Sequence, residues 1–580
     1  MAHVAGVQIQ ARTPWPSAAS KGYQPLKLTL ENLEEEPRDL ELNVEGGWGS
    51  SGLRLTRSVR VGPRERLEVE LLVPAYVLDS REFRMKVVSG ADRGYTGGLG
   101  STQAIATYTH LVAVFSGASG AGIRANTWSE DLSPMGSSTS WGQGRWRHLG
   151  LHLEADWDAD AAVVAGEVSF DDMSRRWEAY SSLDLAVVDL TAGLPPGPEL
   201  EALMAWARLG GVVVFVGDDA NRTLAGVPAV DAWRHERFAL APLDGAPAVQ
   251  RFQAGFGRLL VAPRDGLLDD PQIAAATLAE VRQRVRTDWT PSPRGSRGTG
   301  EGLRPEIPGL GVVPYRTFVV LMIVFALVVG PVNLIWTRRR GKPVALLFTI
   351  PGVALVGAVL ALGYGFLGQG ISIRTHADTV ALLDQRSGLV AGAEVRALFA
   401  GLAPGKGLVP GQGTGVFPWG VDLMNRDDAR YDIRHGQETS LRAGYLPSRL
   451  MVRQALLTSR GSKLRLEVDA TDGGCAIENG LGVDVEELVV HALDGDWFRL
   501  AGVVEAGGSA RLEPLPGPPP AGSPEADLTT FHPDELAVLP RGTWAARTST
   551  PAFRDDCGLE LVEVGGSHHL LGILPEGAGR

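Results

Sequence analysis

FVVLMIVFALVVGPVNLIW, from Phe318 to Trp336, and VALLFTIPGVALVGAVLALGYGFL, from Val344 to Leu367, are two apolar stretches that follow one another closely in this chain. Neither contains Asp, Glu, Lys or Arg. Each is close to the roughly 20 residues that a helix rising about 1.5 Å per residue needs to cross about 30 Å of hydrocarbon. The two stretches therefore predict a transmembrane hairpin over residues 317–368. The alternative is a pair of buried helices in a soluble protein, but core helices rarely stay uncharged over such lengths.

The connection between the two stretches is strongly basic, since it holds Arg338, Arg339, Arg340 and Lys342. Cations in short loops mark the cytoplasmic side of a membrane. We therefore expect a two-pass protein of the cytoplasmic (inner) membrane, with the lipid bilayer as a partner. Its N-terminal and C-terminal parts should both be extracytoplasmic.

Three residues interrupt the first stretch: Gly330, Pro331 and Asn333. Helix breakers are tolerated in membranes where a neighbouring helix satisfies the freed backbone groups, and the second stretch provides that neighbour. Trp336 stands near the end of the first stretch, where amphipathic rings prefer the membrane interface.

The composition sets further limits. A chain of 580 residues is too long to fold around one hydrophobic core, so we expect three or more domains besides the hairpin. Its 55 Lys and Arg against 67 Asp and Glu argue against a nucleic-acid partner, which requires cations to neutralise phosphates. The first 25 residues contain no basic segment followed by an apolar one, so no signal peptide is visible. Either a signal peptide is missing or removed, or the orientation is inverted. We expect the former, because the loop between the apolar stretches is strongly basic.

Hydrophobic periodicity divides the chain into five parts. Residues 1–103 alternate apolar and polar side chains between turns, which predicts an immunoglobulin-like β-sandwich. Residues 104–286 combine apolar strands with helices, which predicts an α/β domain with a parallel sheet. Residues 287–316 are rich in Pro and Gly and predict a linker. The hairpin follows, and alternation over 369–580 predicts a second β-rich domain.

Within the α/β domain, the expected strands are His110–Phe115, Leu183–Leu190, Val212–Val216 and Leu259–Ala262, and the expected helix is Glu199–Leu209. The segment YSSLDLAVVDL and the later ELEALMAWARLGGVVVFVGDD resemble the class I glutamine-amidotransferase-like (flavodoxin-type) domain of large bacterial membrane proteins. In that family a hairpin follows the domain, and its first helix ends in a Gly-Pro-Val/Leu-Asn stretch. Residues 330–333 match this stretch, and IENGLGVDVEELVV (477–490) extends the likeness.

True amidotransferases use a cysteine nucleophile with a histidine base, but residues 104–286 contain no cysteine. Ser116 could replace it only with a base in reach, and nothing in the sequence brings His148, His152 or His235 there. We therefore expect loss of catalysis, no cofactor and no enzyme.

Metal binding is not expected either. We expect the candidate groups on solvated faces or in turns, and they lack the spacing of a metal-binding loop. The His568-His569 pair is expected in a turn. The other candidates are His148, His152, Asp156, Asp158, Asp160, Asp171 and Asp172.

The two cysteines, Cys475 and Cys557, both follow the hairpin. In an oxidising compartment they could form a disulfide, and the alternative is two unpaired buried thiols.

The sequence thus predicts a membrane-anchored extracytoplasmic scaffold or interaction protein without catalysis, which holds membrane or envelope protein partners. One alternative is an accessory, solute-binding subunit of a membrane transporter. A further alternative, an envelope hydrolase, would use Ser116 or the histidine and aspartate cluster.

Overall fold

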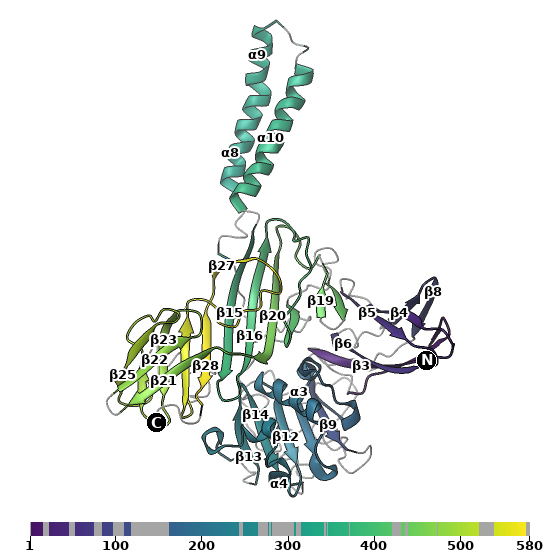
Figure 1. The fold of residues 1–580 in the computed structure, drawn as a ribbon. Helices are drawn as coiled ribbons and strands as arrows, with labels where there is room; N and C mark the ends of the chain where they lie inside the picture. The colour runs from purple at the N-terminus through teal and green to yellow at the C-terminus, as the bar shows by residue number, and fades with distance from the viewer. Residues whose placement is uncertain are drawn as a thin grey trace, which may run out of the picture.

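The protein is mostly β-sheet, with four sheets and few helices among the described residues (Figure 1). The computed structural model describes residues 2–15, 22–45, 53–74, 84–96, 109–117, 162–242, 248–264, 277, 280, 307–308, 315–341, 344, 346–369, 372–419, 431–435, 439–442, 444–471, 474–520 and 539–575.

The N-terminal strands form two facing sheets around one apolar core. Leu26, Leu28 and Leu30 are buried at alternate positions of one strand and share a core with Leu42 and Val44 of the other sheet. This period of two is that of strands with one buried face. The first sheet contains β1 (Ala2–Val4), β2 (Val7–Arg12), β3 (Tyr23–Asn32) and β6 (Arg66–Pro74). The second contains β4 (Arg38–Glu45), β5 (Leu53–Val61), β7 (Arg84–Ser89) and β8 (Asp92–Thr96).

The second sheet also contains two strands from beyond the helical hairpin, β18 (Tyr431–His435) and β19 (Thr439–Leu441). β18 pairs in parallel with β5, with Ile433 opposite Leu55. Ile433 is buried in the core of the sandwich. The predicted 1–103 sandwich therefore gains two strands that the sequence did not assign to it.

The third sheet has the order β10-β9-β11-β12-β14-β13 and is parallel except for its last strand. The residues of β11 and β12 are all buried, as expected for strands covered on both faces. Its strands are β9 (Thr109–Ser116), β10 (Ala162–Ser169), β11 (Leu185–Asp189), β12 (Val212–Val216), β13 (Gln250–Ala254) and β14 (Gly257–Ala262).

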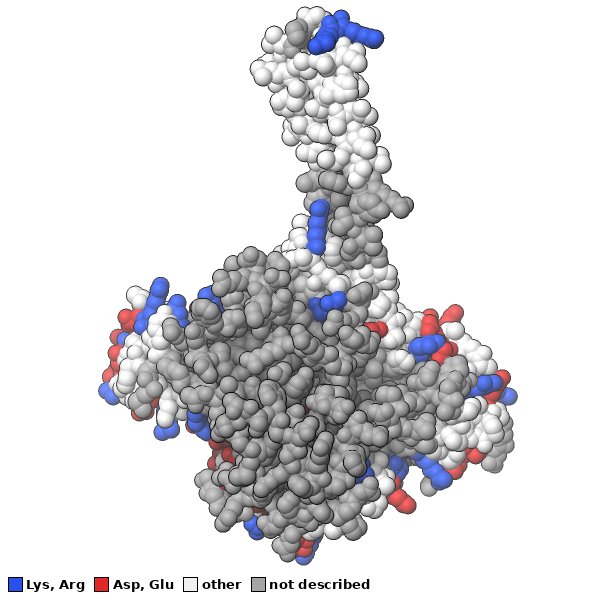
Figure 2. Space-filling model, turned by 180° about the vertical axis from the view of Figure 1, so that it is seen from behind, with Lys and Arg blue, Asp and Glu red and all other residues white. Residues whose placement is uncertain are grey.

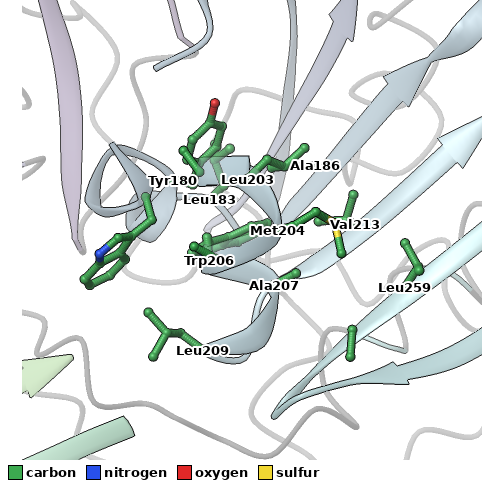
Figure 3. Packing of buried hydrophobic residues seen from close by; sticks show 14 of the residues in the cluster. Tyr180, Leu183, Ala186, Leu203, Met204, Trp206, Ala207, Leu209, Val213 and Leu259 are labelled. Carbon is green, nitrogen blue, oxygen red and sulfur yellow. The ribbon is translucent and has the colours of Figure 1, made fainter. Parts of the chain in front are cut away.

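Helix α3 (Gly197–Arg208) packs on this sheet. Leu203 and Ala207 lie toward Ala186 of β11, Val213 of β12 and Leu259 of β14 in one buried cluster (Figure 3). The helix starts with proline at its first turn and stops before Gly210, whose φ of +112° favours glycine.

The fourth sheet is twelve-stranded and follows the hairpin. Ala391, Ala393 and Val395 of one strand join the same buried cluster as α3. The helix therefore lies between two sheets (Figure 1), which explains why it is buried nearly all round. The strands at the hairpin side are β15 (Ile373–Asp384), β16 (Leu389–Ala400), β17 (Thr414–Trp419), β20 (Met451–Gly461) and β27 (Leu561–Gly565). The others are β28 (His568–Ile573), β26 (Thr543–Thr548), β23 (Val485–His491), β24 (Trp497–Arg499), β25 (Ser509–Leu515), β22 (Gly474–Gly480) and β21 (Arg465–Thr471).

Two antiparallel helical segments project away from the sheets (Figure 1). The outgoing segment is α8 (Tyr315–Leu327), a π-helical turn (Val328–Val332) and α9 (Asn333–Arg339). The π-turn contains Pro331, which lacks an N–H and cannot continue regular helical bonding. The returning helix is α10 (Leu346–Gln369). A Cβ at Gly357 would lie 2.9 Å from the Phe325 ring, so glycine allows close contact between the two segments.

Part of the predicted linker 287–316 contacts the body. Ile307 is 3 % exposed and packs against Ala397 and Phe399 of β16. The segment before the hairpin is therefore held on the face of the twelve-stranded sheet at this point.

A hydrogen bond joins the parts of the chain before and after the hairpin. The Tyr23 hydroxyl on β3 donates to the Val416 carbonyl on β17 at 2.6 Å, and both residues are buried. We predict that Tyr23→Phe lowers the free energy of unfolding by about 1–2 kcal/mol, because the buried carbonyl loses this donor. Tyr95→Phe is the matched control, since Tyr95 is 61 % exposed. Equal unfolding midpoints of the two variants in denaturant titrations would contradict the prediction.

Candidate functional site

The hairpin exposes an unusual number of large apolar side chains. Val320 is 59 % exposed, and Phe348 is 75 % exposed. Others on the outgoing segment are Val319, Met322, Ile323, Val324, Leu327, Val332, Ile335 and Trp336, and others near or on the returning helix are Val344, Leu347, Leu355, Val356 and Val359. Contiguous exposed apolar surface of this kind is typical of protein–protein or membrane interaction sites and of aggregation-prone regions.

One helix of the described residues, Met322–Arg339, has the length and apolar composition needed to cross a membrane. Only 11 % of this segment is buried inside the structure. A shorter apolar segment, Leu346–Val359, follows it. Phe318 and Leu367 lie within α8 and α10, whereas Lys342 lies outside the described residues.

The far end of the hairpin is basic. Arg338, Arg339 and Arg340 are exposed there, and Figure 2 shows Lys and Arg side chains gathered at this tip. The Arg340 guanidinium lies 4.2 Å from the centre of the Trp336 ring, a cation–π contact. Trp336 and the three arginines thus occupy one end of the hairpin.

At the carboxyl edge of the parallel sheet, the turn after β11 lies against the end of β9. Ser116 ends β9 and is 7 % exposed. A Cβ on the adjacent Gly117 would lie 2.4 Å from the Ala192 Cβ, so the turn after β11 fills the space beside it. Asp189 accepts hydrogen bonds from the amide and hydroxyl of Thr191 in that turn. These groups stabilise the turn.

The histidines weighed for catalysis or metal binding are not brought to this edge by any described contact. His235 Nδ1 accepts from the Arg237 amide in a local turn. His148, His152, Asp156, Asp158 and Asp160 lie outside the described residues. His568 and His569 were expected in a turn, and this expectation was wrong: both belong to β28, because β15 and β26 pair with that segment.

Asp172 has a structural role. It contacts Arg12 at 2.6 Å and Lys27 at 3.3 Å, and so connects the third sheet to the N-terminal strands. Burial disfavours its ionised form, but the hydrogen bond from Arg12 and the charge of Lys27 hold the pKa of Asp172 below its ordinary value. Among the described residues no group of three or more His, Cys, Asp and Glu is placed to hold a metal.

The two cysteines are free, so the disulfide is not formed and the alternative of two buried thiols holds. The reason is their placement: Cys475 packs in the core around β22 and Cys557 in the core shared with the N-terminal sandwich. Burial raises the pKa of Cys475 to about 11 and that of Cys557 to about 12. Both remain thiols at neutral pH and are poor nucleophiles.

The sequence analysis missed a buried ionic cluster on β16. Glu394 and Arg396 are two residues apart, so they lie on the same face of the strand. The fully buried Arg396 donates to the Asp555 carbonyl at 2.8 Å, and its guanidinium lies 3.6 Å from Glu394 Oε1. Burial raises the pKa of Glu394, although Arg396 opposes this effect. Two opposite charges in an otherwise apolar strand were the available sequence signal.

A small cavity adjoins Glu394. Its volume is about 30 Å³, and its lining includes Glu394, Thr379, Thr458, His568 and His569. A space of this size accommodates water and not an organic substrate. His568 is fixed by Thr379 Oγ1 and Glu563 Oε1, each at 3.0 Å. A perturbed carboxyl can mark an active site, but the size of this cavity favours a structural, hydrated cluster.

We predict that Arg396→Met lowers the free energy of unfolding by about 3–5 kcal/mol, because Glu394 would be left as a buried charge without its partner. The double variant Arg396→Met/Glu394→Leu should recover most of this loss in denaturant titrations. Arg465→Met is the control: Arg465 pairs with Glu467 at 3.5 Å in an exposed position, and its loss should cost less than about 1 kcal/mol. A double variant as unstable as Arg396→Met alone would refute the ionic coupling.

His569 should make stability depend on pH. Burial, and then the charges of Arg547 and His568, lower its pKa from the ordinary 6.5, while Asp378 opposes them. As the pH falls below 6.5, His569 is therefore protonated in the unfolded chain before it is protonated in the folded one. The free energy of unfolding is highest above pH 6.5 and decreases as the pH falls toward the folded-state pKa. His569→Gln should flatten this part of the pH profile of unfolding free energy. An unchanged slope would contradict the assignment.

Comparisons with known proteins leave the family open. No protein-family model matches the chain, and no curated protein does. Among solved structures, a yeast delta-COP-I mu-homology domain is similar at 12% identity and a TM-score of 0.18, over 35% of this chain and 95% of that one. A Paenibacillus sp. cycloisomaltooligosaccharide glucanotransferase is similar at 9% identity and a TM-score of 0.12, over 36% of this chain and 46% of that one. Similarity at these TM-scores carries no functional argument.

Proposed function

We propose that this protein is a membrane-anchored scaffold without catalysis, which holds a large β-rich body at one face of a bilayer for interaction with membrane or envelope proteins. The observation that carries the proposal is that the parts of the chain before and after an exposed apolar hairpin pair with each other. β5 and β18 share a parallel ladder although the hairpin separates them in sequence.

The first support is the exposure of the hairpin. A core helix of a soluble protein has a similar composition but is mostly buried, whereas Met322–Arg339 is 11 % buried. Each large apolar side chain kept in water forgoes about 1.5–3 kcal/mol of burial free energy. A bilayer removes this cost for side chains all round both segments at once.

The second support is topological. Since β5 and β18 belong to one sheet, the parts before and after the hairpin lie on the same side of any membrane. The chain between them must then cross an even number of times. The outgoing segment α8 to α9 and the returning α10 supply two crossings, and α10 alone, with 24 residues, is about 36 Å long.

The orientation follows from charge. The tip with Arg338, Arg339 and Arg340 belongs on the cytoplasmic side by the positive-inside rule. The body then lies on the extracytoplasmic face of the cytoplasmic membrane.

The proposed likeness to a glutamine-amidotransferase-like domain has support from topology. The five parallel strands lie in the order β10-β9-β11-β12-β14. Numbered along the chain without the antiparallel β13, this is the 2-1-3-4-5 order of flavodoxin-like sheets. A catalytic role has no such support: residues 104–286 contain no cysteine, and the thiols of Cys475 and Cys557 are buried with raised pKa values. The cavity beside Glu394, at about 30 Å³, is too small for an organic solute.

Labelling of introduced cysteines tests the arrangement. Arg339→Cys places a thiol at the exposed tip, and Ser509→Cys places one on the exposed start of β25 in the body. With a membrane-impermeant maleimide, Ser509→Cys should react in intact bacterial cells and Arg339→Cys only after permeabilisation. The wild-type chain is the control, because Cys475 and Cys557 are buried.

The opposite pattern would invert the orientation. Equal reaction of both thiols in intact cells, together with extraction of the protein by alkaline carbonate, would refute membrane anchoring.

A further inference from the structure

Exposed apolar side chains gather at the end of the twelve-stranded sheet from which the hairpin emerges. They are Leu402 (57 % exposed), Leu450 (40 %), Met451 (39 %) and Val562 (50 %). They belong to the segments that surround the first residue of β15, where the chain returns from α10 (Figure 1). They form what we call the hairpin-proximal patch.

Strand register places the members of the patch together. Ile373, the first residue of β15, is opposite Ala400 on β16 and Leu561 on β27. Met451 opens β20 opposite Phe399, next to Ala400. The Arg449 amide donates to the Ala400 carbonyl at 2.8 Å, which holds the segment that enters β20 at the same end.

The length of α10 brings the patch to the level of lipid headgroups. Its 24 residues extend about 36 Å, whereas the hydrocarbon core is about 30 Å thick and the whole bilayer about 40–45 Å. The helix therefore ends within the headgroup layer. β15 begins four residues after Gln369, within at most about 14 Å of the end of the helix.

Cations accompany the apolar side chains. Arg374 is opposite Val562 in the β15–β27 register, Arg449 precedes Leu450, and Arg453 follows Met451 on β20. Arg449 is exposed and has a φ of +61°, an uncommon conformation for a residue other than glycine. The acidic Glu563 at this end is engaged by Arg554 and His568. Figure 2 shows Lys and Arg side chains where the hairpin joins the body.

We propose that the hairpin-proximal patch docks onto the bilayer that holds the hairpin, with Leu402, Leu450, Met451 and Val562 in the headgroup layer and Arg374 and Arg449 against anionic lipid phosphates. This inference rests on the proposed membrane anchoring. Apolar side chains rimmed by cations are the composition that binds anionic membrane surfaces. The contact fixes the tilt of the body relative to the bilayer.

Environment-sensitive fluorescence in the full chain tests this contact. Leu402→Cys and, as control, Val503→Cys each receive a nitrobenzoxadiazole label. Val503 is an equally exposed apolar residue (63 %) beyond β24, four strands from β15 in the sheet order. The buried native cysteines give the unlabelled background. The proteins are reconstituted into vesicles of phosphatidylcholine, with or without phosphatidylglycerol, that contain nitroxide-headgroup lipid.

We expect quenching at position 402 to be several-fold stronger than at position 503, and stronger with phosphatidylglycerol than without it. Arg374→Gln should abolish the phosphatidylglycerol increment and leave carbonate-resistant insertion unchanged. Equal weak quenching at both positions in a carbonate-resistant protein would overturn the docking proposal and leave the anchor intact. Protection of position 402 in native membranes without quenching in vesicles would assign the patch to a protein partner and overturn it too. Loss of carbonate resistance in the wild type would refute the anchor itself.

Discussion

The parallel ladder between β5 and β18 is the constraint on which the arrangement of this protein depends. It joins a segment near the N-terminus to one that follows the hairpin, and the buried Ile433 brings the later segment into the sandwich core. The Tyr23 hydroxyl adds a second connection, to a carbonyl 393 positions later. Once these contacts form, the two parts of the chain are one body. The hairpin then projects from that body and does not link independent domains.

The twelve-stranded sheet separates the apolar clusters of this body, because its two faces contribute to different clusters. One face of β16 contributes Ala391, Ala393 and Val395 to the cluster around α3. The opposite face carries Val390 in one apolar cluster and Leu398 in another. Glu394 and Arg396 lie between those two residues along the strand, so the ionic cluster separates two apolar cores. A buried pair of this kind contributes little net stability. Its effect is to penalise any register of β16 that leaves either charge unpaired.

Local pattern was enough to predict some of these elements and not others. Val212–Val216 has the predicted bounds, and α3 begins two residues before the predicted Glu199 and ends one residue before Leu209, because continuous apolar runs and a Gly-Gly stop are local signals. β18 and β19 are short, and their partner is distant in sequence, so nothing local identified them. The strand at His568 depends on β15 and β26 as neighbours. The ionic cluster escaped notice because periodicity cannot tell that both faces of β16 are covered.

The hairpin reverses the usual distribution of polarity. Its buried positions include the polar Asn333 and Thr337, and the Thr337 hydroxyl donates to the Asn333 carbonyl at 2.8 Å. Its exposed positions along both segments include many Val, Ile, Leu, Met and Phe side chains. In water this arrangement is unfavourable, since an amphipathic helix buries its apolar stripe. In hydrocarbon it is the favourable one, because small and polar groups associate between helices and apolar chains contact lipid. The same sequence can be stable in this form only where its surroundings are apolar, and that requirement favours the bilayer that we propose around it.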